Sequence, residues 1–257
     1  MFVDTHCHLS FSDFDADRDA IVGRMVREEI EILVNPGVDV NESQNAVMCA
    51  QRYSSVYAAV GCHPCHVLSI DFLPSVMTAL EHLVDEEKVV AIGETGFDFY
   101  KEVNPPKHVQ DAYFLEHIRL AKQFSKPLIV HSRMAWDDTF RVLEAEQDGT
   151  LSGVFHCFSG NEKEVKRAVD LGFMISFSGT VTFKNKTNTQ IVPSVPIDYL
   201  LTETDAPFLS PHPFRGKRND PLKIPLIVGE IARLREAPIE DIKTSVSRNA
   251  KKLFKLN

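Results

Sequence analysis

Short apolar runs recur along the whole chain, and longer amphipathic stretches separate most of them. The runs are rich in Val, Ile, Leu and Phe, and each ends in Gly, Pro or polar residues. This pattern is typical of strands that are buried on both faces of a parallel sheet. There are eight such runs, at residues 1–6, 31–37, 56–64, 89–96, 127–132, 153–160, 173–179 and 199–205.

The stretches between and after the runs carry apolar residues at helical spacing, as Val76, Leu80 and Leu83 illustrate. They predict helices over residues 15–29, 40–53, 71–85, 107–124, 134–147, 161–171, 221–235 and 239–254. Asp39 and Asp220 are typical residues to precede a helix, and proline follows the second of them. Eight strand-helix alternations predict a (β/α)8 TIM barrel, with an open doubly wound sheet as the alternative. No linker, internal repeat or low-complexity tract interrupts the pattern, so we expect residues 1–257 to form one domain.

The expected strand ends carry an unusual concentration of possible metal ligands. In a barrel of this type, the C-terminal ends of all strands meet on one face, where active sites lie. Six such residues are His6, His8, Glu94, His131, His156 and Asp205. Alternate residues of a strand share a face, so His6 and His8 should point the same way while Cys7 turns into the core. Each residue alone also fits an ordinary structural role, but their joint placement predicts a metal site.

Four imidazoles and two carboxylates suit Zn, Mn, Fe or Co, and accept Mg less readily. Six ligands exceed what one catalytic ion needs, so we expect two divalent ions about 3.5–4 Å apart with Glu94 as the bridge. Asp205 is expected to bind one ion and also to accept a proton from the attacking water. Glu203 is expected to hold a ligand in place rather than to bind metal, with an additional ion as the alternative.

A second group of residues could contact an anionic substrate. Arg133 follows the fifth run, and the loop after the eighth run carries Arg215, Lys217 and Arg218. Guanidinium groups match phosphate oxygens in pairs, and the loops after strands seven and eight of such barrels often bind phosphate. We therefore expect phosphate contacts here, with a solvated surface loop as the alternative. Tyr100 and its aromatic neighbours after Glu94 are expected to pack rather than to stack on bases.

Composition narrows the classes of partner. The formal net charge of −8 argues against a broad electropositive surface for duplex nucleic acid. It leaves a phosphate-bearing substrate possible, because bound cations invert the local charge of an acidic site. Five cysteines, an odd number, argue against a disulfide framework. Cys62 and Cys65 form a CxxC, which we expect to be a loop at a strand end rather than a redox or zinc site.

The sequence also lacks the features of a membrane protein. No apolar run approaches the roughly 18–20 residues of a membrane span. Residues 1–10 have neither the basic nor the apolar region of a signal peptide. We therefore expect a cytoplasmic protein without membrane contact.

Seven segments together resemble the TatD family of metal-dependent deoxyribonucleases, within the amidohydrolase-like barrels. They follow one another in the family order and cover nearly the whole chain. The segments are DTHCHL at 4–9, GCHP at 61–64, GETGFDFY at 93–100, PLIVHSR at 127–133, HCFSG at 156–160, TETDAPFL at 202–209 and RGKRNDP at 215–221.

The resemblance implies a barrel with a one- or two-metal centre. One ion would be held by His6, His8 and Asp205, and the other by His131 and His156, with Glu94 between them. His63 is similar to a family histidine placed to contact the scissile phosphate, so Asp205, Glu94 and His63 are the implied catalytic residues. The implied cofactors are two divalent ions (Mg, Mn or Zn).

The implied reaction is hydrolysis of phosphodiester bonds in DNA, 3′→5′ exonucleolytic on single strands, with a role in DNA repair. No stable protein partner is expected.

The chain departs from the family pattern at two positions. Cys65 stands where the family often has His, and His117 stands where it often has Gln. Two other classes of function compete with the nuclease: an amidohydrolase-type enzyme for a small phosphoester, lactone or amide, and a non-catalytic metal-binding barrel. The complete ligand set argues against the last of these.

Overall fold

Eight parallel strands form one sheet whose spatial order follows the chain from β1 to β8. The computed structural model describes residues 1–184 and 187–256. The strands are β1 (Phe2–Asp4), β2 (Ile30–Pro36), β3 (Val56–Val60), β4 (Val89–Asp98), β5 (Leu128–Arg133), β6 (Gly153–Phe155), β7 (Phe173–Phe177) and β8 (Leu200–Thr202). All residues of β4 and β7 are buried, which explains why these strands are continuous apolar runs rather than alternating ones.

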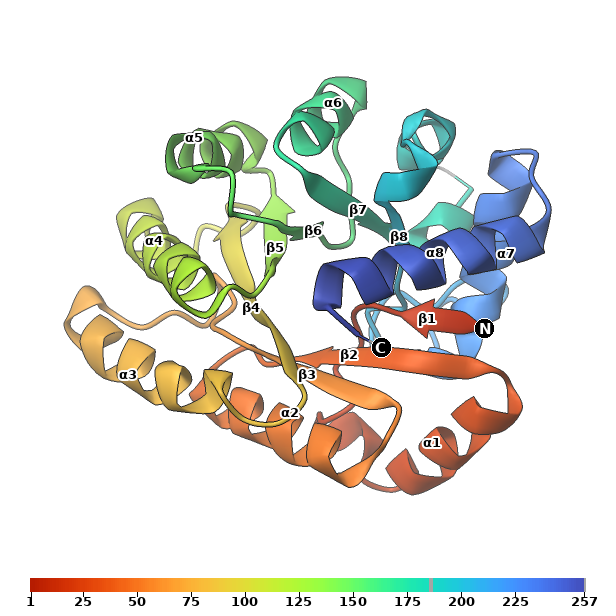
Figure 1. Cartoon of the computed structure of the whole chain (residues 1–257), viewed down its shortest axis with the longest axis horizontal. Helices are drawn as coiled ribbons and strands as arrows, with labels where there is room; N and C mark the ends of the chain where they lie inside the picture. Colours follow the sequence, from red (N-terminus) through yellow and green to blue (C-terminus); the bar gives the residue numbers. More distant parts are fainter. Residues whose placement is uncertain (185–186, 257) are drawn as a thin grey trace.

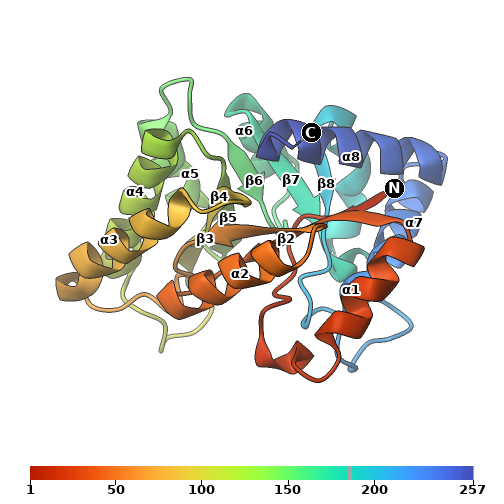
Figure 2. The ribbon, with the colours of Figure 1, turned by 60° about the horizontal axis from the view of Figure 1, so that its bottom comes forward.

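Helices surround the strands on the outside, as Figure 1 shows and Figure 2 confirms from a second direction. They are α1 (Arg18–Arg27), α2 (Val40–Arg52), α3 (Leu73–Val84), α4 (Lys107–Phe124), α5 (Trp136–Glu146), α6 (Glu162–Asp170), α7 (Ile224–Leu234) and α8 (Ile239–Phe254). Each falls within a few residues of its expected range. The predicted (β/α)8 barrel is therefore confirmed over the open-sheet alternative. None of the helices in the described ranges combines the length and the apolar character needed to cross a bilayer.

The expected eight-fold alternation fails at one connection. Between β7 and β8, the described residues form short 3-10 turns instead of an α-helix, at Gly179–Thr182, Thr187–Gln190, Val192–Ser194 and Ile197–Tyr199. Two α-helices, α7 and α8, instead follow β8. The polar stretch 182–190 and the prolines at 193 and 196 explain the absence of a continuous helical pattern there.

The barrel closes between β8 and β1 through the residues beyond the two strands. Thr5 donates its N–H to the carbonyl oxygen of Thr202 at 3.0 Å, and His8 donates to that of Ala206 at 2.8 Å. Helix α8 packs against both β1 and β8 and so covers this seam. Its Asn249 side chain donates to the carbonyl oxygen of Leu200 at 2.9 Å. These contacts fix the first and last strands relative to each other, although they are about 200 residues apart in sequence.

Candidate metal centre

The six predicted metal ligands all meet at the C-terminal end of the barrel. Glu94 belongs to β4 and His131 to β5, and the others follow the ends of their strands. Contrary to expectation, β1 ends at Asp4, so His6 and His8 lie on the segment that continues beyond it. Their rings nevertheless converge, with the two Nε2 atoms 3.2 Å apart. Cys7 between them is fully buried, as predicted.

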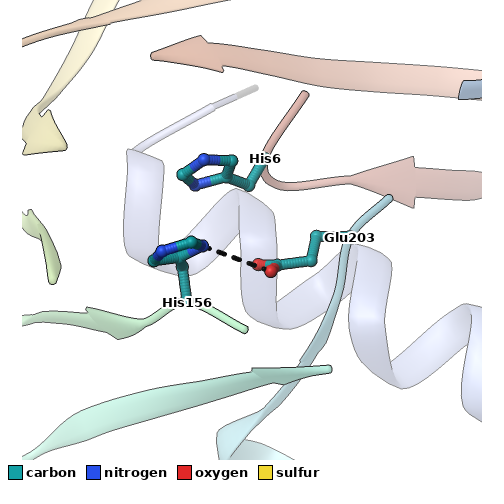
Figure 3. A group of neighbouring side chains, drawn as sticks. All are labelled: His6, His156 and Glu203. Atoms are coloured by element: carbon teal, nitrogen blue, oxygen red, sulfur yellow. Dashed lines mark ion pairs between the residues drawn. The ribbon is translucent and has the colours of Figure 1, made fainter. Parts of the chain in front are cut away.

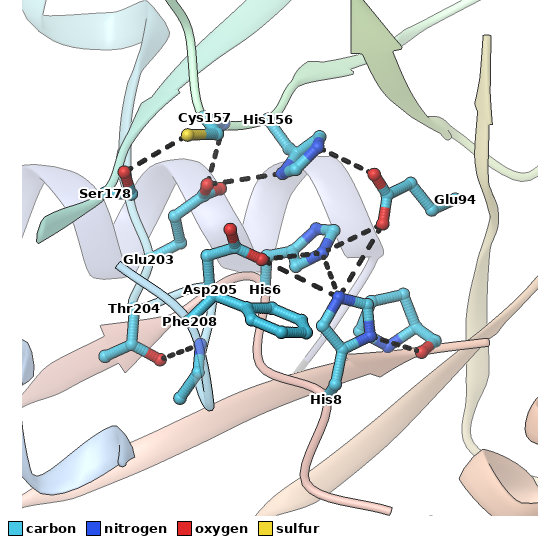
Figure 4. A network of polar contacts seen from close by, with 12 residues as sticks. His6, His8, Glu94, His156, Cys157, Ser178, Glu203, Thr204, Asp205 and Phe208 are labelled. Carbon is cyan, nitrogen blue, oxygen red and sulfur yellow. Dashed lines mark hydrogen bonds and ion pairs between the residues drawn. The ribbon is translucent and has the colours of Figure 1, made fainter. Parts of the chain in front are cut away.

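The first group of ligands consists of His6, His8 and Asp205 together with one oxygen of Glu94 (Figure 4). Oδ1 of Asp205 lies 3.7 Å from Nε2 of both histidines. Oε2 of Glu94 lies 3.2 Å from Nε2 of His6 and 3.8 Å from Nε2 of His8. Both carboxylates therefore direct one oxygen toward the pair of histidine nitrogens.

The second group uses the other oxygen of Glu94. Oε1 lies 2.8 Å from Nδ1 of His131 and 2.8 Å from Nε2 of His156, and the two ring nitrogens are 3.0 Å apart. His63 lies at the edge of this group, with Nε2 3.3 Å from Nδ1 of His131 and 3.4 Å from Oε1 of Glu94. The sequence places these residues on four different strand ends, and the fold brings them within ligand distance.

The distances fit a pair of metal ions. Bonds of about 2.0–2.2 Å to a tetrahedral ion separate neighbouring ligand atoms by about 3.3–3.6 Å. In the first group, the distances between the histidine nitrogens and from them to the carboxylate oxygens are 3.2–3.8 Å, close to these values. The second is tighter, at 2.8–3.0 Å, so an ion would spread it by a few tenths of an ångström. Glu94 directs one oxygen toward each group. This position is compatible with the predicted role of Glu94 as a bridge between two metal ions.

Three of the ligand rings are oriented by a partner on their other nitrogen. Nδ1 of His8 lies 3.2 Å from the carbonyl oxygen of Pro36. Nε2 of His131 lies 3.0 Å from Oδ2 of Asp98, and Nδ1 of His156 lies 3.4 Å from Oε1 of Glu203. Such contacts fix which nitrogen carries the proton and leave the other free for a metal. Glu203 contacts His156 and, together with His6 and His156, also forms a group that could hold a metal, so both roles expected for it stay predictions.

His6 is oriented differently. Its Nδ1 is buried without a hydrogen-bond partner in the described residues, and its ring stacks on that of His156 at 4.1 Å between centroids (Figure 3). The stack sets the two rings nearly parallel, at 14°. On the other side, Phe11 stacks on His8 at 4.6 Å. Ring packing therefore supports His6, whose Nδ1 has no hydrogen bond in the described residues, and adds to the hydrogen bond that orients His8.

The electrostatics of the centre favour metal binding. Burial and neighbouring imidazoles lower the pKa of His8 to about 3, so this ring is neutral, as a ligand must be. Burial alone would raise the pKa of Glu94, but the surrounding histidines outweigh it and hold that pKa well below its usual value. Burial lowers the pKa of His156, but Glu94 and Glu203 outweigh it and raise that pKa well above its usual value. The two carboxylates therefore favour positive charge at the position of His156.

Asp205 differs from the other carboxylates. Burial raises its pKa well above the usual value, and the negative charges of Glu203 and Glu94 add to this shift. A carboxyl group with a raised pKa can accept a proton near neutral pH. The expected second role of Asp205, as proton acceptor, stays a prediction.

The predicted substrate residues fall into two kinds. Arg133 is exposed, and its guanidinium stacks on the Tyr100 ring at 3.6 Å. Arg215 is exposed and stacks on Phe183 at 4.1 Å, and Lys217 is exposed in the same loop.

Arg218 is already engaged within the protein. It forms an ion pair with both carboxylate oxygens of Asp17, at 2.5 and 3.0 Å, and also donates to the carbonyl oxygen of Asp13. The structure therefore assigns Arg218 a role in joining the loop after β8 to the segment before α1. We leave it out of the phosphate contacts proposed below.

Sequence reasoning missed Asp98, which touches the ligand His131. A signal was available, because Glu94, Gly96 and Asp98 occupy alternate positions of one extended segment and thus one face. The expected strand stopped at residue 96, whereas β4 runs to Asp98. Phe11 was also missed, and an aromatic residue three positions after a metal ligand gives no specific signal.

The whole chain is similar to one group of known proteins. A family model described as TatD-related DNase matches residues 3–255. The chain belongs to the TatD family. It is 39% identical over 258 residues to an uncharacterized metal-dependent hydrolase of Bacillus subtilis, YabD, with 100% of both chains covered. It is 36% identical to an uncharacterized metal-dependent hydrolase of Mycobacterium tuberculosis, TatD, over 99% of this chain and 98% of that one.

Solved structures of TatD proteins have the same fold. The crystal structure of the TatD homologue YjjV of Escherichia coli K12 superposes with a TM-score of 0.92 and 30% identity, covering 100% of this chain and 98% of that one. A TatD family hydrolase of Entamoeba histolytica superposes at a TM-score of 0.88 with 19% identity, covering 100% and 98%. The chain is therefore a metal-dependent hydrolase of the TatD family, and its His, Glu and Asp clusters are able to bind metal ions.

Proposed function

We propose that this TatD-family chain is a deoxyribonuclease that hydrolyses phosphodiester bonds of single-stranded DNA from the 3′ end. The observation that carries the proposal is the pair of ligand groups that share Glu94, next to an exposed arginine on β5. Paired ions suit in-line displacement at phosphorus, and the arginine suits the charge of the phosphate. Its role would be in DNA repair or turnover.

The residues of the two groups would act as metal ligands and as a proton acceptor. His6, His8 and Asp205 would hold one ion, and His131 and His156 the other, with one Glu94 oxygen for each. Bound divalent ions lower the pKa of water and offset the negative charge of a phosphodiester. Asp205 would take up the proton lost by the attacking water, because its carboxylate lies among the ligands of the first ion.

The residues around the centre would bind the substrate. His63 lies at the edge of the second group and is 16% exposed, so a neutral imidazole there can donate to a phosphate oxygen. Burial and nearby histidines lower its pKa to about 3, although Glu94 opposes this, so it would act without a charge. Arg133, Arg215 and Lys217 would supply the positive charge for the phosphates.

A groove formed by loops at the C-terminal end of the barrel could receive the neighbouring nucleotides. It has a volume of about 1000 Å³ and is lined by residues that follow β4, β5 and β6, among them Phe99, Trp136 and Ser159. Pockets for small molecules span about 300–1,000 Å³. The groove lies at the upper end of this range and has room for a nucleotide.

The test uses metal-stripped protein and single-stranded DNA labelled at its 5′ end. Product length is followed over time without metal, with Mg and with Mn. We expect a metal-dependent ladder that shortens from the 3′ end, absent in Asp205→Asn. Asp198→Asn is the matched control, because this exposed carboxylate pairs with Arg248 and precedes β8, at the opposite end of the barrel. No cleavage with any metal would refute the nuclease and favour a small-molecule hydrolase.

A further inference from the structure

Asp98 is a buried carboxylate whose two oxygens serve different neighbours. It ends β4, four residues after Glu94, and is 4% exposed. Its Oδ2 lies 3.0 Å from Nε2 of the ligand His131. Its Oδ1 accepts the N–H of Tyr100 at 2.9 Å and the side-chain amide of Asn104 at 2.8 Å. One side chain therefore touches both a metal ligand and the loop that follows β4.

The first contact determines which nitrogen of His131 can bind metal. Oδ2 is an acceptor and favours the ring proton on Nε2; with an ion bound to Oε1 of Glu94, Nδ1 would then keep its lone pair for that ion. Nδ1 is the atom that faces Oε1 of Glu94 at 2.8 Å and Nε2 of His156 at 3.0 Å. A neighbour that donates instead of accepting would favour the other tautomer and turn a proton toward the ion.

The second contact supports Arg133. Tyr100 is held by its N–H on Asp98, and its ring lies beneath the Arg133 guanidinium at 3.6 Å. A guanidinium that stacks by its face keeps its N–H edge available for a phosphate. Asp98 and Arg133 are also paired in register across β4 and β5. The loop and the arginine thus take their positions from the same carboxylate.

Asp98 itself is fixed by its backbone. Gln110 of α4 accepts its N–H at 2.9 Å and donates to its carbonyl oxygen at 3.1 Å. Asn104 donates to the same carbonyl oxygen at 3.1 Å. With both backbone groups bonded, the carboxylate has little freedom to move, as a positioning role requires.

We propose that Asp98 is a positioning residue that joins the second metal position to the phosphate contact. One oxygen sets the tautomer of His131, and the other holds the 98–104 loop, whose Tyr100 supports Arg133. The part of this inference that concerns Arg133 and phosphate rests on the proposed function. The part that concerns His131 and the metal position does not depend on any substrate.

The first experiment titrates metal-free protein with Mn²⁺ by calorimetry. Asp98→Asn keeps an oxygen for Tyr100 and Asn104 but turns an amide N–H toward His131. We expect one of the two sites to bind Mn²⁺ about 10–100-fold more weakly and the other to remain unchanged. Asp198→Asn serves again as the matched control. Two unchanged sites in Asp98→Asn would overturn the proposal, whether or not the wild type cleaves DNA.

A second measurement covers the case that Asp98→Asn does not fold. In the zinc-loaded wild type, long-range ¹⁵N–¹H spectra of labelled histidines report the tautomer of each ring. We expect His131 to carry its proton on Nε2 and to bind through Nδ1. Metal bound through Nε2 of His131 would overturn the proposal on the unaltered protein.

The loop half is tested with inorganic phosphate as the probe on the Mn²⁺-loaded enzyme. Tyr100→Ala should weaken phosphate binding about 2–5-fold, and Tyr100→Phe, which keeps the ring, should restore it. Neither variant should change Mn²⁺ affinity. Unchanged phosphate binding in Tyr100→Ala would overturn this half. If the wild type cleaves no DNA while Asp98→Asn loses a metal site, the proposed function fails and the positioning of His131 stands.

Discussion

His117 is a buried residue outside the metal centre whose substitution should change the pH dependence of stability. It is fully buried in α4, where Nε2 accepts the N–H of Cys62 at 2.9 Å and Nδ1 donates to the carbonyl oxygen of Tyr113 at 2.6 Å. The ring must be neutral for this arrangement. Burial accordingly lowers its pKa from 6.5 to about 4, partly opposed by the Tyr113 carbonyl.

The size and sign of the effect follow from proton linkage. The folded-state pKa lies below the unfolded one, so the unfolded chain binds more protons between pH 6.5 and pH 4. Stability from this residue is complete above pH 6.5 and falls as the pH decreases. At pH 5 the loss relative to pH 8 is about 2 kcal/mol in the free energy of unfolding.

His117→Gln should remove this pH dependence. A glutamine can accept from Cys62 and donate to Tyr113 without titrating, and it is the residue that the TatD family often carries here. We expect urea unfolding at pH 8 to change by at most about 1 kcal/mol. The loss between pH 8 and pH 5 should be about 2 kcal/mol smaller in the variant than in the wild type. Parallel pH profiles for the two proteins would refute a neutral, buried His117.

Three further predictions concern the centre and its loops. Glu94→Gln should lower turnover more than about 100-fold and bind fewer Mn²⁺ ions by calorimetry, with unchanged circular dichroism. Gly96→Ala should lower the free energy of unfolding in urea by about 3 kcal/mol, because φ is +131° and the added Cβ would lie 2.1 Å from the carbonyl oxygen of His131. In steady-state kinetics, Lys217→Ala should raise KM for DNA about 3–10-fold. Arg218→Ala should leave KM unchanged and lower the free energy of unfolding by at most about 1 kcal/mol, since its ion pair is exposed. Equal KM increases would contradict the roles assigned to the two residues.

The strand ends could be predicted from the sequence because each buried parallel strand is a short, continuous apolar run that ends in Gly, Pro or polar residues. Knowing that eight such ends converge on one face was enough to group His6, His8, Glu94, His131, His156 and Asp205. The extent of β4 could not be predicted in this way. Its register shifts against β5 between Ile92 and Thr95, and Gly93 and Gly96 have positive φ angles there. A strand with two such glycines does not resemble a regular apolar run, so its last two residues were not counted.

Contacts across the sequence explain the other differences. The partner of Arg218 is Asp17, 201 residues earlier, and local pattern carries no information on such a pair. The same holds for His117, whose partner Cys62 lies 55 residues away. Composition predicted an acidic protein. Only the fold determines which basic side chains remain available to bind a phosphate. Of the four basic residues expected there, three stay exposed and unengaged by a carboxylate in the described ranges, namely Arg133, Arg215 and Lys217.

The arrangement of carboxylates accounts for how an acidic chain can act on an anionic substrate. Glu94 and Asp205 face the metal positions, whereas Asp98 and Glu203 lie behind the histidines and are turned toward their second nitrogens. Negative charge is thus concentrated where cations bind and is shielded by the rings. If the two ions were removed, these carboxylates would repel a phosphate, so DNA affinity should be lost together with activity. A metal-free protein that still bound single-stranded DNA would show that the exposed basic residues bind the substrate without the centre.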